Sequence, residues 1–273
     1  MIKSSGQAKK EEEIKNMITI YPEIEENLLP QLRRAAIFVN CYEPKRTDVE
    51  IMEISITYPD SLKVEELLYA ATLYEDNETK IKIYESVVIA YPNNGVGHHN
   101  AGAVSIEMGE YKAASGYLTN ANNLLPNNGK VINNLGVLEC QLGNYKKAEI
   151  YFRKAKNLGE NVNYNIGVLE ILDGNYDEAL RLFGKTKCKY NVALAQLLNG
   201  DNAGAEKNLN CAPKTAEVYY LLAIIGSRTN NTNMLYENLI KAIELDPEYK
   251  SIAGLDREFI GYYTSPDFQN IVQ

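Results

Sequence analysis

The sequence has no tryptophan and only 2 histidines among 273 residues, whereas it has 20 tyrosines. A tyrosine ring is apolar but its hydroxyl group seeks water, so tyrosine suits helix faces that are only half buried. This composition is typical of a protein built from many thin layers with little deep interior. Apolar residues make up 45% and charged residues 23%, close to the average of soluble domains, so disorder is not predicted.

Long apolar runs are also missing, since none approaches the length that spans a bilayer. Residues 1–13 lack the apolar core of a signal peptide. We therefore expect either a cytoplasmic protein or an internal piece of a longer exported chain, periplasmic or associated with an outer membrane. The formal net charge of −8 repels nucleic-acid phosphates, and no basic stripe is interleaved with aromatic residues, so we expect no nucleic-acid partner.

The four cysteines are scattered without any close pair, which argues against a zinc ribbon or a redox motif: Cys41, Cys140, Cys188 and Cys211. Our expectation is that they are buried free thiols, because cysteine is a good small core residue. The alternative is a disulfide between Cys188 and Cys211. These two residues would lie at opposite ends of one antiparallel helix pair, where the chain returns to its start, and the sequence leaves this alternative open.

Catalytic and cofactor sites find little support. His98 and His99 are neighbours that point about 100° apart on a helix, so they cannot share one metal ion, and no carboxylate or thiol partner is evident. Residues 95–102 carry three glycines that resemble a loose dinucleotide loop, but the preceding strand and the later acidic residue of that motif are missing. The sequence therefore predicts a protein that is not an enzyme and binds no cofactor or metal.

Internal self-similarity is the strongest signal in the sequence. Three consecutive segments each contain a small residue and, seven positions later, a Gly-x-Tyr-x-x-Ala motif. The three copies begin at Gly102, Gly136 and Gly167. A glycine inside a helix costs about 1 kcal/mol relative to alanine, which is tolerable where a neighbouring helix must approach closely. The second glycine of each copy can adopt the left-handed conformation that ends a helix.

This pattern resembles the tetratricopeptide repeat family, whose period of 34 residues separates Gly102 from Gly136. The resemblance implies an all-α fold: a tetratricopeptide-type α-α superhelix (solenoid) of about six helix-turn-helix repeats, with a small N-terminal helix and strand appendage and a C-terminal capping helix. We expect the solenoid over residues 47–249, the appendage over 1–46 and the cap over 250–273. The expected repeats are 61–94, 95–128, 129–159, 160–186, 187–212 and 213–249.

The N-terminal sixty residues do not follow the repeat. We expect a charged amphipathic helix over Lys9–Glu26, a strand over Arg34–Tyr42 and an unpaired helix over Thr47–Tyr58 that covers the first repeat. Residues Leu32–Val39 resemble the closing strand of a peptidoglycan-binding domain of the outer-membrane protein A type. In several Bacteroidetes outer-membrane-associated proteins such a strand precedes tetratricopeptide repeats, which implies a cell-envelope setting. The residues that bind peptidoglycan in that domain have no counterpart here.

A partner would bind the concave groove that the first helix of each repeat lines in this family. Family positions that point into the groove carry over to a first row, His99, Asn133, Tyr164, Tyr190 and Tyr220, and to a second row, Ala103, Val137, Val168, Leu194 and Ile224. Such a surface fits a peptide or protein segment with apolar anchors. The alternative is a structural spacer or homodimerisation module in which the tyrosines fill their own groove.

The family also implies a carboxylate clamp in some members, made of asparagine with paired lysine and arginine. The asparagines are present at Asn100, Asn134, Asn165 and Asn191, but the basic partners are missing. We therefore expect no carboxylate clamp, and expect these asparagines to bond backbone groups between adjacent first helices.

Overall fold

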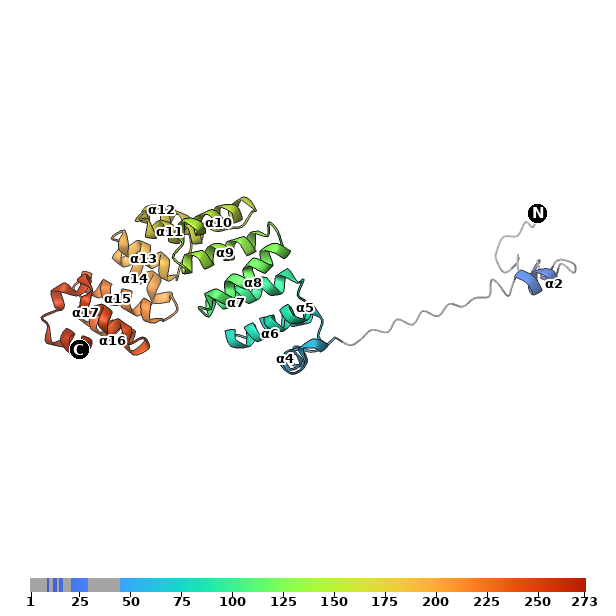
Figure 1. Ribbon diagram of the computed structural model, residues 1–273, viewed down its shortest axis with the longest axis horizontal. Coiled ribbons are helices and arrows are strands. Elements are labelled where there is room, and N and C mark those ends of the chain that lie inside the picture. The colour runs from blue at the N-terminus through green and yellow to red at the C-terminus, as the bar shows by residue number, and fades with distance from the viewer. Residues whose placement is uncertain (1–8, 10–11, 14, 17–20, 29–44) are drawn as a thin grey trace. The chain divides into compact units, whose positions relative to one another are not determined.

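A computed structural model describes residues 9, 12–13, 15–16, 21–28 and 45–273 (Figure 1). The chain divides into two compact units, residues 1–46 and 47–273. In the first unit the described elements include a short helix α2 (Tyr21–Glu23), which continues into a π-helical turn η1 (Ile24–Leu28). The strand expected over Arg34–Tyr42, the segment Leu32–Val39 and Cys41 lie outside the described residues.

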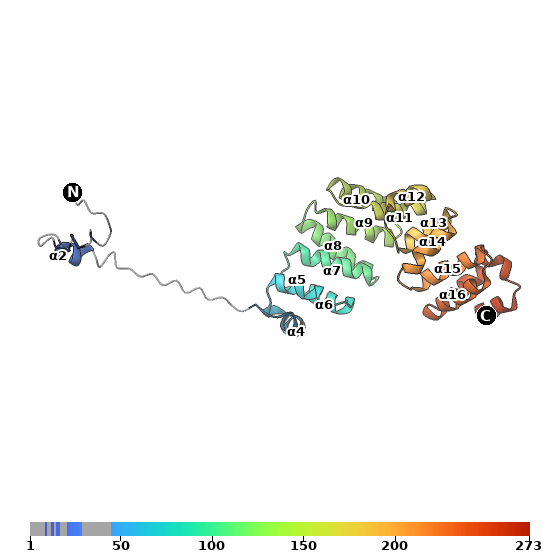
Figure 2. The ribbon, with the colours of Figure 1, turned by 180° about the vertical axis from the view of Figure 1, so that it is seen from behind.

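The second unit is built from antiparallel helix pairs that stack side by side in chain order (Figure 1), and Figure 2 shows the same stack from behind. It begins with α4 (Asp48–Thr57) and the turn η2 (Pro59–Ser61). The pairs that follow are α5 (Val64–Thr72) with α6 (Asn77–Ala90), α7 (Gly95–Glu107) with α8 (Tyr111–Leu124), α9 (Gly129–Gln141) with α10 (Tyr145–Asn157), α11 (Asn163–Leu172) with α12 (Tyr176–Phe183), α13 (Tyr190–Leu198) with α14 (Asn202–Cys211), and α15 (Ala216–Arg228) with α16 (Thr232–Leu245). The regular elements of the described residues are helical, which confirms the predicted all-α superhelix.

The first helices of the central pairs end at glycines with positive φ: Gly109, Gly143, Gly174 and Gly200. After each, a backbone N–H bonds the carbonyl five residues earlier; the Asn144 N–H, for example, lies 2.8 Å from the Glu139 oxygen. This bond satisfies a carbonyl that the helix end would otherwise leave unpaired. In the last pair Asn230, with φ of 54°, takes the position of the glycine, because asparagine tolerates the left-handed region.

The small residues inside the first helices sit where the second helix crosses. A methyl group added to Gly136 would lie 2.5 Å from Cε1 of Phe152, and one added to Gly167 would lie 2.7 Å from Cε1 of Phe183. Both phenylalanines are buried. Glycine therefore lets an aromatic ring from the second helix rest directly on the backbone of the first.

The C-terminal cap consists of three short segments: α17 (Glu248–Leu255), the 3-10 helix η3 (Arg257–Tyr262) and α18 (Pro266–Val272). Phe259 and Phe268 are fully buried in the cluster that contains α15 and α16. Apolar residues of the cap thus extend the core of the last pair beyond α16, which fits the expected need to cover an end repeat.

A disulfide joins Cys188 to Cys211, with 4.9 Å between their Cα atoms. The expectation of free thiols is wrong for this pair. The loop before α13 turns back at Cys188, whose φ is 57°, and α14 ends at Cys211, so the short fifth pair brings the two residues together. Cys140 is a free, half-buried thiol, and burial raises its pKa to about 11. In the described part of the chain, helices long and apolar enough to cross a membrane are not found.

Candidate functional site

The first helices carry a row of hydrogen-bonded polar side chains, which we name the polar row: His99, Asn134, Asn133 and Asn165. Nδ2 of Asn134 lies 2.9 Å from Nε2 of His99, and Nδ2 of Asn165 lies 2.7 Å from Oδ1 of Asn133. Asn133 donates to Asn134 at 3.2 Å, which closes the chain across α7, α9 and α11. Each side chain is half buried. The row therefore joins the first helices of three consecutive repeats.

His99 fits this row in its neutral form. Burial lowers the pKa of His99 from its ordinary value, and the Asn134 amide nitrogen can donate only to a ring nitrogen that lacks a proton. With Nε2 accepting, the proton of the neutral ring is on Nδ1.

The structure corrects the role expected for the asparagines at the clamp positions. Asn134 and Asn165 bond side chains of the polar row, and Nδ2 of Asn191 lies 3.2 Å from the Tyr164 hydroxyl. These amides therefore bond side chains across neighbouring first helices, and the expectation of backbone partners is wrong for these three. The backbone carbonyl groups within a helix are already paired with N–H groups of the same helix. An asparagine amide that extends to the adjacent repeat therefore bonds a side chain there.

Tyr164 and Tyr190 are half buried. The ring of Tyr164 packs on Phe183 with 5.1 Å between centroids, so one face is used for packing. Burial, with smaller contributions from Tyr249 and Glu217, raises the pKa of Tyr190 to about 12. The Tyr190 phenol is therefore a neutral hydrogen-bonding group at physiological pH.

Tyr220 and Ile224, expected at the C-terminal end of the groove, are buried under the cap. Tyr220 is 7% exposed, and its hydroxyl donates to Asp256 at 2.7 Å. Its ring packs on Tyr249 and Phe259 with centroid distances of 4.7 and 5.7 Å. These two positions therefore do not line an accessible groove. The cause is the cap, whose contacts lie far along the chain from Tyr220.

The second row is buried to about the same degree as the first. Val137, Val168 and Leu194 are half buried and pack against the cores of their repeats, and Ala103 is half buried as well. His98 is buried, with Nε2 3.0 Å from the Pro92 carbonyl oxygen and its ring near Tyr117. Among the described residues, no group of three or more His, Cys, Asp or Glu side chains could hold a metal ion.

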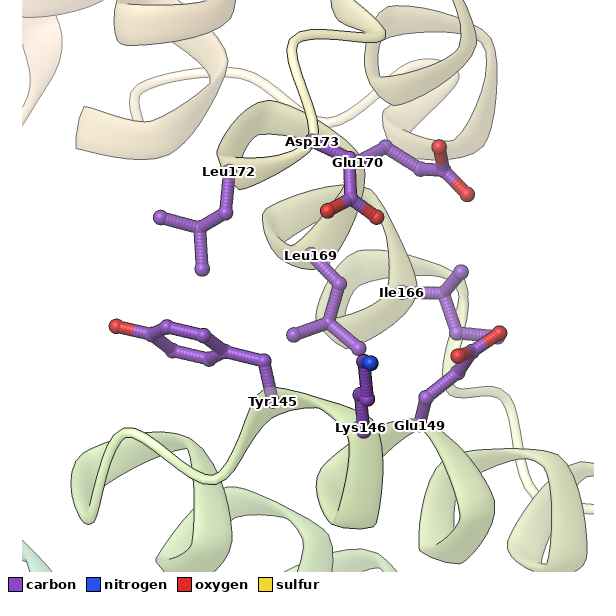
Figure 3. A pocket seen from close by; sticks show the side chains of 8 residues that line it. All are labelled: Tyr145, Lys146, Glu149, Ile166, Leu169, Glu170, Leu172 and Asp173. Carbon is purple, nitrogen blue, oxygen red and sulfur yellow. The ribbon is translucent and has the colours of Figure 1, made fainter.

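A hollow that no sequence pattern predicted lies between α10 and α11 (Figure 3). It encloses about 180 Å³ and is lined by Tyr145, Lys146, Glu149, Ile166, Leu169, Glu170, Leu172 and Asp173. A signal for it exists in the repeat alignment, because Leu172 occupies the position at which the preceding repeat has Gln141.

Comparisons with known proteins agree on the repeat. Residues 130–163 and 216–249 each match a tetratricopeptide repeat model. A tetratricopeptide repeat protein from Parabacteroides merdae is 20% identical, with a TM-score of 0.57 over 83% of this chain and 91% of that one. A chain of the APC/C hetero-tetramer Cut9–Hcn1 is 17% identical, with a TM-score of 0.62 over 77% of this chain, which spans only 46% of that chain.

The type IV pilus biogenesis factor PilW is 16% identical, with a TM-score of 0.52 over 77% of this chain and 98% of PilW. None of the curated protein sequences matches this chain significantly. At these identities the structural likeness concerns the fold. The chain contains tetratricopeptide repeats, and its superhelix is the fold of helical-repeat scaffolds that typically bind other proteins.

Proposed function

We propose that this chain is a non-enzymatic scaffold that binds a peptide or protein segment along the first helices of its second to fifth repeats. The observation that supports this most is the polar row with Tyr164 and Tyr190 beside it. These side chains are half exposed on a face that tetratricopeptide repeats use for binding.

The chemistry of the row suits a polypeptide backbone. Each asparagine amide has two N–H donors and an oxygen with two acceptor sites, and the contacts within the row use only part of this capacity. The remaining donors and acceptors can pair with peptide N–H and carbonyl groups. Val137, Val168 and Leu194, also half buried on the first helices, offer apolar contact to alternate side chains of an extended segment.

A library of displayed random peptides tests this proposal. Peptides selected on the full chain should bind a His99→Ala, Asn133→Ala double variant about tenfold more weakly, or worse, because groove hydrogen bonds are lost. The matched control is Asn120→Ala with Asn123→Ala, two exposed asparagines on the second helix α8. Equal affinity for both double variants and the wild-type chain would remove the groove from consideration.

One observation favours a second candidate, a spacer or dimerisation module that fills its own groove. The cap already buries Tyr220 and Ile224. The combined change of Tyr164→Ala and Tyr190→Ala separates the two candidates. A binding groove predicts lost peptide capture with helical content near that of the wild type, whereas a self-filled groove predicts loss of helical signal from the middle repeats, measured by circular dichroism.

A cell-envelope setting is the finer part of this proposal. Disulfides persist in oxidising compartments and are rare in the cytosol, so the Cys188–Cys211 bond supports export of the chain. PilW, a pilus biogenesis factor, has a similar fold. Trapping thiols with a maleimide in acid-quenched cells that produce the full-length protein gives the test. If Cys188 and Cys211 react with the maleimide in such cells, the proposed cell-envelope location would be contradicted.

A further inference from the structure

One junction between repeats departs from the pattern of its neighbour. In the second repeat Tyr111, at the start of α8, donates a hydrogen bond of 3.2 Å to Gln141 at the end of α9. The equivalent residues one repeat later are Tyr145, at the start of α10, and Leu172, at the end of α11. A leucine cannot accept a hydrogen bond. Among described residues the Tyr145 hydroxyl has no hydrogen-bond partner, and Tyr145 is 46% and Leu172 53% exposed.

These two exposed side chains form the walls of the hollow between α10 and α11, which we name the notch. Figure 3 shows Tyr145 projecting from α10 and Leu172 from α11 on the same side, with Leu169 between the two helices. The notch therefore offers the exposed aromatic face of Tyr145 and the exposed side chain of Leu172, with the buried Leu169 between them.

Charge around the notch is mainly negative. Its lining contains the carboxylates of Glu149, Glu170 and Asp173 and one ammonium group, that of Lys146. Glu149 pairs with Arg153, and Glu170 accepts a hydrogen bond from Asn175. Within the part of the chain that the structure describes, Asp173 forms no ion pair, and its carboxylate points toward the space between the helices in Figure 3.

One side chain, arginine, complements all three features of the notch: the aromatic face, the aliphatic wall and the unpaired carboxylate. Arginine has a planar cation that stacks on a tyrosine ring and binds a carboxylate through two parallel hydrogen bonds, and its methylene stem covers apolar surface. A lysine ammonium is compact and strongly hydrated, so it gains less from the ring. We propose that the notch binds an arginine side chain of a partner polypeptide.

The partner is a polypeptide, because the notch continues into two further hollows along the same edge. One is lined by Gly143–Lys147 with Asp173, and the other by Glu170, Gly174–Glu178 and Asn199. An extended segment carrying the arginine can follow this edge. The residues of the polar row line none of the three hollows, so the notch is a second surface and its failure would leave the proposed groove untouched.

The test uses the full chain labelled with ¹⁵N and the blocked peptide Gly-Gly-Arg-Gly-Gly as probe. We expect amide shifts confined to α10, α11 and the adjoining Asp173, and a millimolar dissociation constant. The same peptide with citrulline, a neutral isostere of arginine, should bind at least about fivefold more weakly, as should the lysine peptide. Shifts that are absent from α10 and α11, or that are equal for the three peptides, would overturn the proposal.

Two variants separate binding from folding. Leu172→Gln recreates the pair that Tyr111 and Gln141 form, so it should close the notch, keep the spectrum dispersed and weaken arginine-peptide binding at least about fivefold. Asp173→Asn should weaken it similarly by removing the charge. Asn120→Ala, at an exposed position on α8 outside both proposed surfaces, is the control and should bind like the wild type. Undiminished binding by Leu172→Gln would contradict the assignment.

Discussion

At the scale of single residues, the glycines inside the first helices allow the second helix of each pair to pack closely. Gly136→Ala would place a methyl group 2.5 Å from a ring carbon of Phe152. Alanine gains about 1 kcal/mol of helix propensity, but overpacking of a close contact costs about 1–3 kcal/mol, so we expect a net loss of stability. Gly116→Ala is the matched control, because its methyl group would meet no atom within 4 Å and should stabilise α8. Urea unfolding measures both; a Gly136→Ala protein as stable as the wild type would refute the close-contact role.

The local repeat predicted the roles of some single residues but not of others. The period predicted Gly109 and Gly143 as helix ends because the motif repeats locally. It could not predict that Asn230 would replace the glycine in the last pair, since that pair lacks the motif. The burial of Tyr220 was missed for a different reason. Its partner Asp256 is 36 residues further along the chain, and no local pattern reports such a contact.

At the scale of elements, the cap is held to α15 by polar bonds as well as by packing. Arg228 bonds the Glu258 carboxylate, and Tyr220 donates to Asp256. The family resemblance predicted that a cap would cover the last repeat. Its division into α17, η3 and α18 was not predicted, because short segments give too few turns for a clear helical period.

The hydroxyl of Tyr220 tests this attachment. Tyr220→Phe should lower the free energy of unfolding by about 1–2 kcal/mol, because it leaves the Asp256 carboxylate without its partner beneath the cap. Burial and the Asp256 carboxylate both raise the pKa of Tyr220, so the hydroxyl stays protonated and the loss should be the same at pH 6 and pH 9. The control is Tyr262→Phe, whose hydroxyl bonds no described residue. Equal stability of the two variants would show that the bond contributes nothing.

At the scale of the whole molecule, a solenoid is a chain of nearest-neighbour contacts, so one weak repeat can interrupt it. The sequence predicted the stack from the 34-residue period, yet two local features depend on departures from that period. The notch arises where a leucine replaces a glutamine. The helices of the fifth pair are short, so they have few residues with which to pack against each other. The sequence allowed a disulfide between Cys188 and Cys211 but did not predict it.

The Cys188–Cys211 disulfide should determine which helix pair unfolds first. It closes a loop between residues 23 apart, and removing such a constraint costs about 3 kcal/mol in the chain-entropy model. Reduction should therefore loosen the fifth pair before its neighbours and open its lysine-rich approach, Lys185, Lys187 and Lys189, to trypsin. We expect cleavage between residues 185 and 207 within minutes in reducing buffer and slow cleavage in oxidised protein. Cys188→Ser with Cys211→Ser should match the reduced pattern without any reductant. If trypsin cuts the oxidised and reduced chains at the same sites and rates, the fifth pair is held by its packing alone.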